Sequence, residues 1–161
     1  MLRPLVNAQM GAIADQLKAQ SQTIAVAESS TAGLISATLV AVPGASAFYQ
    51  GGSVVYTLAA RKSLLGISRA DVAGLEPLTE PMVTRFAQRA REQLDATWGI
   101  AELGVAGPSG APYGHPPGIS VIAVVGPTIL STTVRTDNDD REQNMWAFTE
   151  AAIDLLHQAL R

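Results

Sequence analysis

The sequence predicts an α/β fold for residues 1–161: a single domain with a mixed, mainly parallel sheet and helices on both faces, giving three layers. Short β-prone apolar runs alternate with stretches whose apolar residues recur at helical spacing, which is typical of β-α-β units. Hydrophobic residues make up 47% of the chain and charged residues 16%, which indicates a well-buried sheet. Two late apolar runs are separated only by Gly126-Pro127-Thr128, a spacing that predicts a hairpin and so adds antiparallel pairing.

The first half of the chain is predicted to alternate between helices and strands. Pro4 is expected near the first turn of the first helix, where the missing N–H does no harm. The Gly51-Gly52 pair inside the second strand predicts a bulge. Thr57 and Gly66 are typical caps for the start and the end of the helix between them. In order, we expect helix 5–19, strand 23–27, helix 34–42, strand 48–56 and helix 58–65.

The second half is predicted to supply the remaining strands and two longer helices. Residues 68–76 form a polar connection with one helical turn near its start. Thr79 caps a helix that runs to about Ala96, and Asp137 or Asn138 opens the last helix. Strands are expected at 100–105, 119–125 and 129–135, and the two helices are expected to bury Met82, Phe86, Ala90 and Leu94, and Met145, Phe148, Ala152, Leu155 and Leu156.

Charge and composition exclude several classes of function. The net charge is −3, and the 11 Lys and Arg residues are scattered, so we expect no nucleic-acid partner. The chain has no cysteine and only two histidines, which excludes disulfides and thiolate chemistry and leaves few ligands for a metal. Residues 1–20 lack the basic and apolar regions of a signal peptide, so we expect none there, and no apolar run reaches the roughly 18 residues of a membrane span. We therefore expect a cytoplasmic protein with no membrane partner.

Residues 23–34 are predicted to form a strand, a tight turn and the start of a helix. Ser29, Ser30 and Thr31 lie in that turn, where helix N–H groups lack partners and the helix dipole favours negative charge. Phosphates and developing oxyanions bind well at such a place. The alternative interpretation is that the three hydroxyls only cap the helix.

The loop 106–118 is dense in Gly and Pro and, at thirteen residues, longer than most connections between strands. Loops of this length are more often functional than structural. Because strand ends converge on one crevice in an α/β sheet, we expect this loop and the turn at 28–33 to share a pocket. The chain contains neither a P-loop nor a G-x-S-x-G elbow.

Ser29 is the best candidate for a nucleophile, because it follows a strand and precedes a helix. A nucleophilic serine needs a base, and the candidates are His115, His157, Lys62 and Tyr56. For the two histidines the alternatives are a surface role near a helix end and a solvated loop position.

Asp137, Asp139 and Asp140 cluster where the last helix begins. We interpret them as capping and dipole charges rather than metal ligands. Arg141 follows them and either binds a phosphate or is a solvated surface arginine.

These motifs resemble, over nearly the whole chain and in the same order, those of the CinA C-terminal-domain family, the nicotinamide-nucleotide amidases. The family's A-E-S-C-T-G-G-L, P-G-A-S, G-G-x-V-x-Y, G-x-A-G-P-x-G and D-R motifs correspond here to residues 27–34, 43–46, 51–56, 104–110 and 140–141, with its P-x-G-x-V slightly altered at 116–121.

The resemblance implies a hydrolase of NAD salvage that deamidates nicotinamide mononucleotide to nicotinate mononucleotide and ammonia. It implies a homo-oligomer that uses no metal or cofactor. It also implies a serine nucleophile, here Ser29, with Tyr56 nearby and a lysine base whose position is occupied here by Arg61. The implied substrate-binding residues are Glu28, Ser30, Thr31, Gly33, Gly52, Gly104, Ala106, Gly107, Ser109, Gly110 and Arg141.

Four departures from the family pattern bear on catalysis. Arg61 stays protonated and cannot accept the serine proton, although it can bind a phosphate or carboxylate with two hydrogen bonds. Lys62 is adjacent, but on a helix it points about 100° away. Leu103 replaces a threonine and so removes a hydroxyl, whereas Ser30 for Cys and Ala32 for Gly are milder changes.

Two alternatives to the amidase therefore stay open. One is a catalytically impaired paralogue that binds a nucleotide or an anion without turning it over. The other is an amidase for a different substrate, with His115 or Lys62 as its base.

Overall fold

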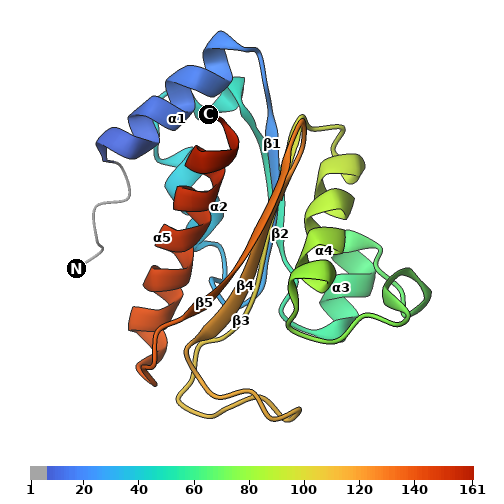
Figure 1. Cartoon of the computed structure of the whole chain (residues 1–161). Coiled ribbons are helices and arrows are strands. Elements are labelled where there is room, and N and C mark those ends of the chain that lie inside the picture. The colour runs from blue at the N-terminus through green and yellow to red at the C-terminus, as the bar shows by residue number, and fades with distance from the viewer. Residues whose placement is uncertain (1–6) are drawn as a thin grey trace.

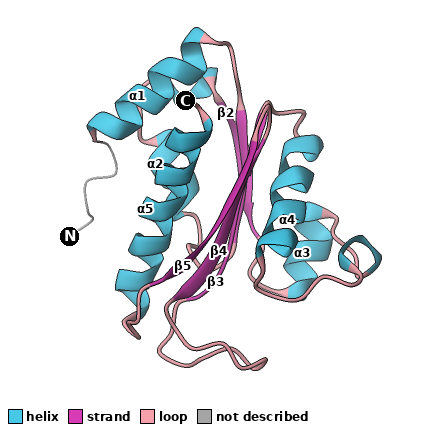
Figure 2. Ribbon diagram, in the orientation of Figure 1, coloured by secondary structure: helices cyan, strands magenta, loops and turns pink. Residues whose placement is uncertain are grey.

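A five-stranded sheet lies between two layers of helices in the computed structural model, which describes residues 7–161 (Figure 1). Pro4 and residues 5–6 of the expected first helix lie outside the described residues. The elements are α1 (Ala8–Ala19), β1 (Ile24–Glu28), α2 (Leu34–Val40), η1 (Ala45–Ala47), β2 (Tyr49–Val54), α3 (Leu58–Leu65), η2 (Ala70–Val72), α4 (Glu80–Gln93), β3 (Trp98–Val105), β4 (Ile119–Val125), β5 (Ile129–Arg135) and α5 (Arg141–Ala159). Helices α1, α2 and α5 cover one face of the sheet, and α3 and α4 cover the other (Figure 2).

The strand order across the sheet is β2-β1-β3-β4-β5. β1 pairs in parallel with β2 and with β3, whereas β4 pairs antiparallel with both β3 and β5. Within residues 7–161, only β4 therefore runs against the other strands, and the predicted mixed, mainly parallel sheet in three layers is confirmed. The hairpin of β4 and β5 has the predicted bounds.

The central strand β1 is buried on both faces because helices cover both sides of the sheet. Ile24 and Val26 pack towards α1, α2 and α5, whereas Ala25 and Ala27 pack towards α3 and α4. Burial on both faces explains why this strand is a continuous apolar run rather than an alternating one.

Hydroxyl and carboxylate side chains cap most of the helices. Thr57 accepts a hydrogen bond from the N–H of Ala60, and Thr79 accepts one from Met82, which confirms the two predicted threonine caps. The start of α5 is different from the prediction, since its cap is Asp140 and not Asp137 or Asn138. Asp137 has a φ of 53°, a left-handed conformation, whereas the cap Asp140 has the extended backbone that is usual at this position.

Other boundaries differ from the prediction by a few residues. α4 ends at Gln93 and not near Ala96, because the backbone leaves the helical region at Leu94, whose side chain is 44% exposed and not buried. In α5, Met145 is only half-buried, and Asn144 is buried instead. The bulge in β2 falls just before the predicted pair of glycines, since Ile24 lies opposite Tyr49 and Ala25 opposite Gly51. None of the helices in residues 7–161 combines the length and the hydropathy needed to span a bilayer.

Candidate active site

A cavity of about 320 Å³ lies at the end of the sheet where β1 and β3 finish. Figure 1 shows the long loop between β3 and β4 and the start of α5 at this same end. The structure confirms that the loop and the β1–α2 turn share one cavity, which is lined by Ser29, Ser30, Tyr56, Arg61, Gly104, Val105, Ala106, Gly107, Ser109, Gly110, Ala111, Pro112, Tyr113 and Arg141. Ten of the residues predicted for the site therefore meet here, from four separate parts of the chain.

The β1–α2 turn places two serine hydroxyls at the wall of the cavity. Ser29 and Ser30 are each 4% exposed, so both are shielded from bulk water. The turn is tight because Ala32 and Gly33 adopt positive φ angles of 51° and 102° before α2 begins. Gly33 is suited to this conformation because it carries no Cβ.

Glu28 does not line the cavity, and its side chain is hydrogen-bonded to the backbone of the turn and of α2. Its buried carboxylate accepts hydrogen bonds from the N–H groups of Gly33, Ile35 and Ser36 at 2.8, 3.1 and 3.0 Å. The free N–H groups of α2 that were expected to hold an oxyanion or a phosphate are therefore already bound to an internal carboxylate. Glu28 thus stabilises the start of α2.

Glu102 is a residue next to the candidate site that the sequence did not predict. It lies on β3, is fully buried, and accepts hydrogen bonds from the N–H groups of Ser29 and Thr31, both at 3.1 Å. The hydroxyls of Ser30 and Ser120 also donate to it, the latter at 3.0 Å. Burial raises the pKa of the Glu102 carboxyl above its usual range, and the hydrogen bonds from Ser30 and the turn oppose that rise. The signal that could have found Glu102 is its charge within a strand otherwise composed of apolar residues and glycine.

Three more of the predicted substrate-binding residues lie outside the cavity. The Thr31 hydroxyl is fully buried between Glu28 Oε1 at 2.7 Å and Glu102 Oε2 at 3.2 Å. Gly33 shapes the turn, and Gly52 packs in the sheet, where a Cβ would come within 2.8 Å of Ser36 Oγ. Like Glu28, these residues do not line the cavity, and they hold the turn and the strands next to it in place.

Arg61 and Arg141 bring two positive charges to the wall of the cavity. The guanidinium of Arg61 lies 5.2 Å from the centroid of the Phe86 ring, and its Nε donates to the carbonyl of Val55 at 3.4 Å. Burial lowers the pKa of Arg61, yet a guanidinium remains charged at any accessible pH. Arg141 donates to the carbonyl of Gly107 at 2.5 Å and to the hydroxyl of Tyr56 at 3.1 Å. Tyr56 is thus directed towards Arg141.

Close packing around Gly104 requires a residue without a side chain. A Cβ at Gly104 would overlap the hydroxyl of Ser30 and would lie 2.6 Å from Glu102 Oε1. Gly104 therefore allows β3 to approach the turn closely enough for Ser30 and Glu102 to meet.

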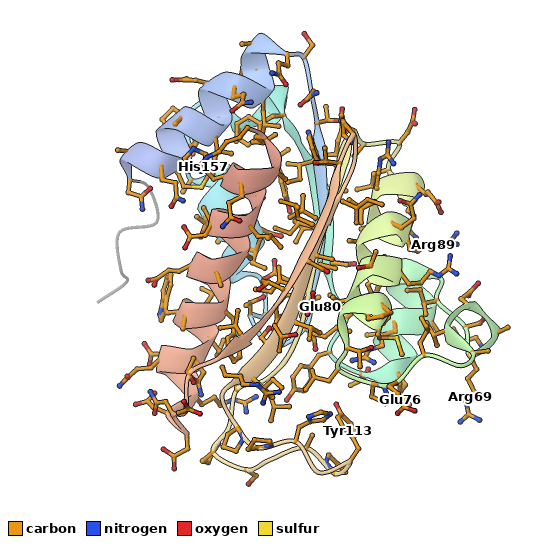
Figure 3. The ribbon with its side chains drawn as sticks, viewed as in Figure 1. Arg69, Glu76, Glu80, Arg89, Tyr113 and His157 are labelled. Carbon is orange, nitrogen blue, oxygen red and sulfur yellow. The ribbon has the colours of Figure 1, made fainter. Side chains whose placement is uncertain are left out.

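The other candidate bases lie elsewhere. His115 packs edge-on against Tyr113, with ring centroids 5.4 Å apart, and does not line the cavity. Nδ1 of His157 lies 3.4 Å from Nε2 of Gln9 in α1. Figure 3 shows His157 at the opposite end of the molecule from Tyr113. Lys62 lines a neighbouring cavity instead.

That neighbouring cavity is larger, about 510 Å³, and mainly apolar. Arg61 and Tyr113 belong to the walls of both cavities, so the two spaces adjoin. Leu103, the residue that replaces the family threonine, faces the apolar cavity. The remaining lining residues include Leu58, Ile67, Val72, Leu78, Met82 and Phe86.

Among residues 7–161, no three His, Cys, Asp or Glu side chains come together as a set that could hold a metal ion. The cavity is lined by residues with hydroxyls and by two arginines, and a buried carboxyl lies behind Ser30.

Comparisons with known proteins place this fold among CinA relatives. The family model for the CinA C-terminal domain matches residues 7–160. A CinA-like protein of Anaeromyxobacter dehalogenans is 36% identical over 146 residues, which cover 91% of this chain and 36% of the relative. A CinA-like protein of Prochlorococcus marinus is 42% identical over 115 residues, which cover 71% of this chain and 27% of the relative. The chain thus spans about a third of the length of these curated relatives.

The crystal structure of a competence-damaged protein (CinA) superfamily protein from Escherichia coli is also similar. It superposes with a TM-score of 0.87 at 25% identity, covering 99% of this chain and 94% of the other. The structure from Enterobacter cloacae gives the same TM-score and identity and covers 100% of this chain and 99% of the other.

Proposed function

This chain belongs to the CinA C-terminal-domain family, and from that premise we propose that it is an amidohydrolase that removes the carboxamide nitrogen of a small nucleotide. The proposed substrate is nicotinamide mononucleotide, and the products are nicotinate mononucleotide and ammonia. The observation that carries the proposal is the cavity in which two shielded serine hydroxyls lie together with Arg61 and Arg141.

Each group in the cavity has a use in this reaction. A serine, Ser29 in the family pattern, attacks the carboxamide carbon and forms an acyl-enzyme. Arg61 carries a fixed positive charge at the wall and stabilises negative charge that develops on the carboxamide oxygen. Arg141, with Tyr56 beside it, binds the phosphate of the nucleotide. The N–H groups of Ser29 and Thr31 are bound to Glu102 and are not assigned to the oxyanion.

The test is the release of ammonia from nicotinamide mononucleotide by the purified chain, with nicotinate mononucleotide identified as the product. The control is the double variant Ser29→Ala/Ser30→Ala, which removes both serine hydroxyls that could act as the nucleophile. Ammonia release above the level of this double variant supports the proposal. Binding of the nucleotide by calorimetry without any release would instead support the impaired paralogue that Arg61 suggests.

A second candidate is supported by the apolar cavity beside the site. An amidase whose substrate has an apolar group, rather than a nucleotide, would fill the space of about 510 Å³ next to Arg61 and Tyr113. Competition between aliphatic or aromatic carboxamides and nicotinamide mononucleotide separates the two candidates. Preferred turnover of the apolar carboxamide would replace the nucleotide as the substrate.

A further inference from the structure

Ser30 and Glu102 are joined by a hydrogen bond at the wall of the cavity. The hydroxyl of Ser30 donates to Oε1 of the Glu102 carboxylate, and Ser30 itself lines the cavity. Ser30 replaces the cysteine of the family motif, and Gly104 leaves the space in which the two side chains meet. A hydroxyl bonded to a carboxylate, on a residue that lines a cavity, gives a nucleophile a base within hydrogen-bond reach.

Ser29, the nucleophile that the family pattern implies, has no such partner. Its backbone N–H donates to Glu102, and no hydrogen bond joins its hydroxyl to Tyr56 or Arg61. Arg61 cannot take a proton in any case. Of the two adjacent serines, the structure therefore gives a proton acceptor only to Ser30.

The surroundings of Glu102 suit a proton acceptor. Glu28 lies on the far side of the Thr31 hydroxyl, and the charge of Glu102 opposes the lowering of the Arg61 pKa that burial causes. Burial raises the pKa of Glu102, so its ionised form is a stronger base than an exposed glutamate.

We infer that Ser30 and Glu102 form the nucleophile and base of this site, in place of the serine and lysine of the family pattern. This inference rests on the proposed amidase function. Ser30 Oγ bonds to the carboxamide carbon as its proton passes to Glu102. The C–N bond then breaks, and the same proton goes to the leaving nitrogen, so that ammonia departs. A water molecule next attacks the ester and gives its proton to Glu102, which returns it to Ser30 Oγ as the acid is released.

The chain offers a matched control in Ser120. Its hydroxyl donates to the same Glu102 oxygen as the hydroxyl of Ser30 does, but Ser120 is fully buried and does not line the cavity. Ser30→Ala and Ser120→Ala each remove one hydroxyl from Glu102, and only the first removes the proposed nucleophile. Glu102→Gln keeps the shape of the side chain but cannot accept the proton.

The first readout is the rate of ammonia release. We expect kcat/KM to fall by roughly 100- to 10,000-fold in Ser30→Ala and Glu102→Gln, and by less than about tenfold in Ser120→Ala. The activity of the unchanged chain should rise with pH as Glu102 loses its proton, and this limb should be absent in Glu102→Gln. Equal losses in Ser30→Ala and Ser120→Ala, or full activity in Ser30→Ala, would overturn the inference and leave the amidase proposal intact.

The second readout does not depend on the substrate. A fluorophosphonate probe should label Ser30, as mapped by mass spectrometry, and the label should be lost in Glu102→Gln and kept in Ser120→Ala. Ser30→Cys introduces a single thiol into a cysteine-free chain, and it should react with iodoacetamide in the folded protein. Label on Ser29, no label at all, or an unreactive thiol overturns the inference. Label on Ser30 without ammonia release would support Ser30 and Glu102 as nucleophile and base but would reject nicotinamide mononucleotide as the substrate.

Discussion

The turn between β1 and α2 is held by two buried carboxylates that differ in what surrounds them. Glu28 is bound by three N–H groups at the start of α2 and by the hydroxyls of Thr31 and Ser36, all within eight residues of it in the sequence. Glu102 comes from another strand and is bound by two N–H groups and by the hydroxyls of Ser30, Thr31 and Ser120. The start of α2 surrounds Glu28, whereas Glu102 is bonded to the hydroxyl of a residue that lines the cavity. Glu28 therefore stabilises the turn, and Glu102 is the carboxylate that we propose takes part in the chemistry.

The largest expected effect is on stability, when Glu28 is removed. Glu28→Ala leaves the N–H groups of Gly33, Ile35 and Ser36 without an acceptor, and each buried unpaired group costs about 1–3 kcal/mol. We expect the free energy of unfolding in urea to fall by roughly 3 kcal/mol or more. Asp71→Ala, which removes an exposed carboxylate bound to Ser68, is the control and should change it far less. A loss of free energy of unfolding no larger than that of Asp71→Ala would show that Glu28 does not stabilise the turn.

Local patterns were sufficient to predict most of the fold. The strands β4 and β5 and the caps Thr57 and Thr79 were predicted correctly because each depends on neighbours in the sequence. The end of α4 was not predicted correctly, because no proline or glycine marks the turn at Leu94 and Asp95.

Some features of the candidate site could likewise be predicted from the sequence, and others could not. The shared cavity could be predicted because Ser29 and the loop 106–118 both follow strands that end at one edge of the sheet. Glu102 could not be assigned, since its partner Ser30 lies 72 residues away in the sequence and no motif marks the pair. Glu28 was placed among the substrate-binding residues because it lies in the motif, yet its partners are within its own turn.

The pH dependence of stability should be carried by Glu102. Because burial raises its pKa, the folded chain retains a proton at pH values where the unfolded chain has lost it. Stability is then greatest below the usual glutamate pKa of about 4.3 and falls as the pH rises through the raised pKa. Urea unfolding measured across this pH range should show the fall in the unchanged chain and not in Glu102→Gln. The same fall in both proteins would show that another group is responsible.

A smaller effect is expected on substrate binding when Arg141 is changed. Arg141→Gln keeps a hydrogen-bond donor near Tyr56 but loses the charge that we assign to the phosphate. The KM for nicotinamide mononucleotide should rise about tenfold, which corresponds to about 1.4 kcal/mol, and turnover of nicotinamide riboside should be unaffected. Arg135→Gln, an exposed arginine on β5 that does not line the cavity, is the control. An equal rise in KM for the nucleotide and the riboside would show that Arg141 does not bind the phosphate.

The smallest expected effect, and the one that separates the two ways of supplying a base, is that of Arg61→Lys. This change restores the family lysine and keeps a positive charge, but it replaces the planar guanidinium that lies on the Phe86 ring. If Glu102 is the base, the lysine has no proton to accept from Ser30, and kcat/KM should fall by only a few-fold, in line with roughly 0.5–1 kcal/mol for a cation–π contact. A gain of about 100-fold or more would show that a missing base limits the reaction. Combining Arg61→Lys with Glu102→Gln then identifies where the proton goes, because activity that survives in the double variant depends on the lysine and not on the carboxylate of β3.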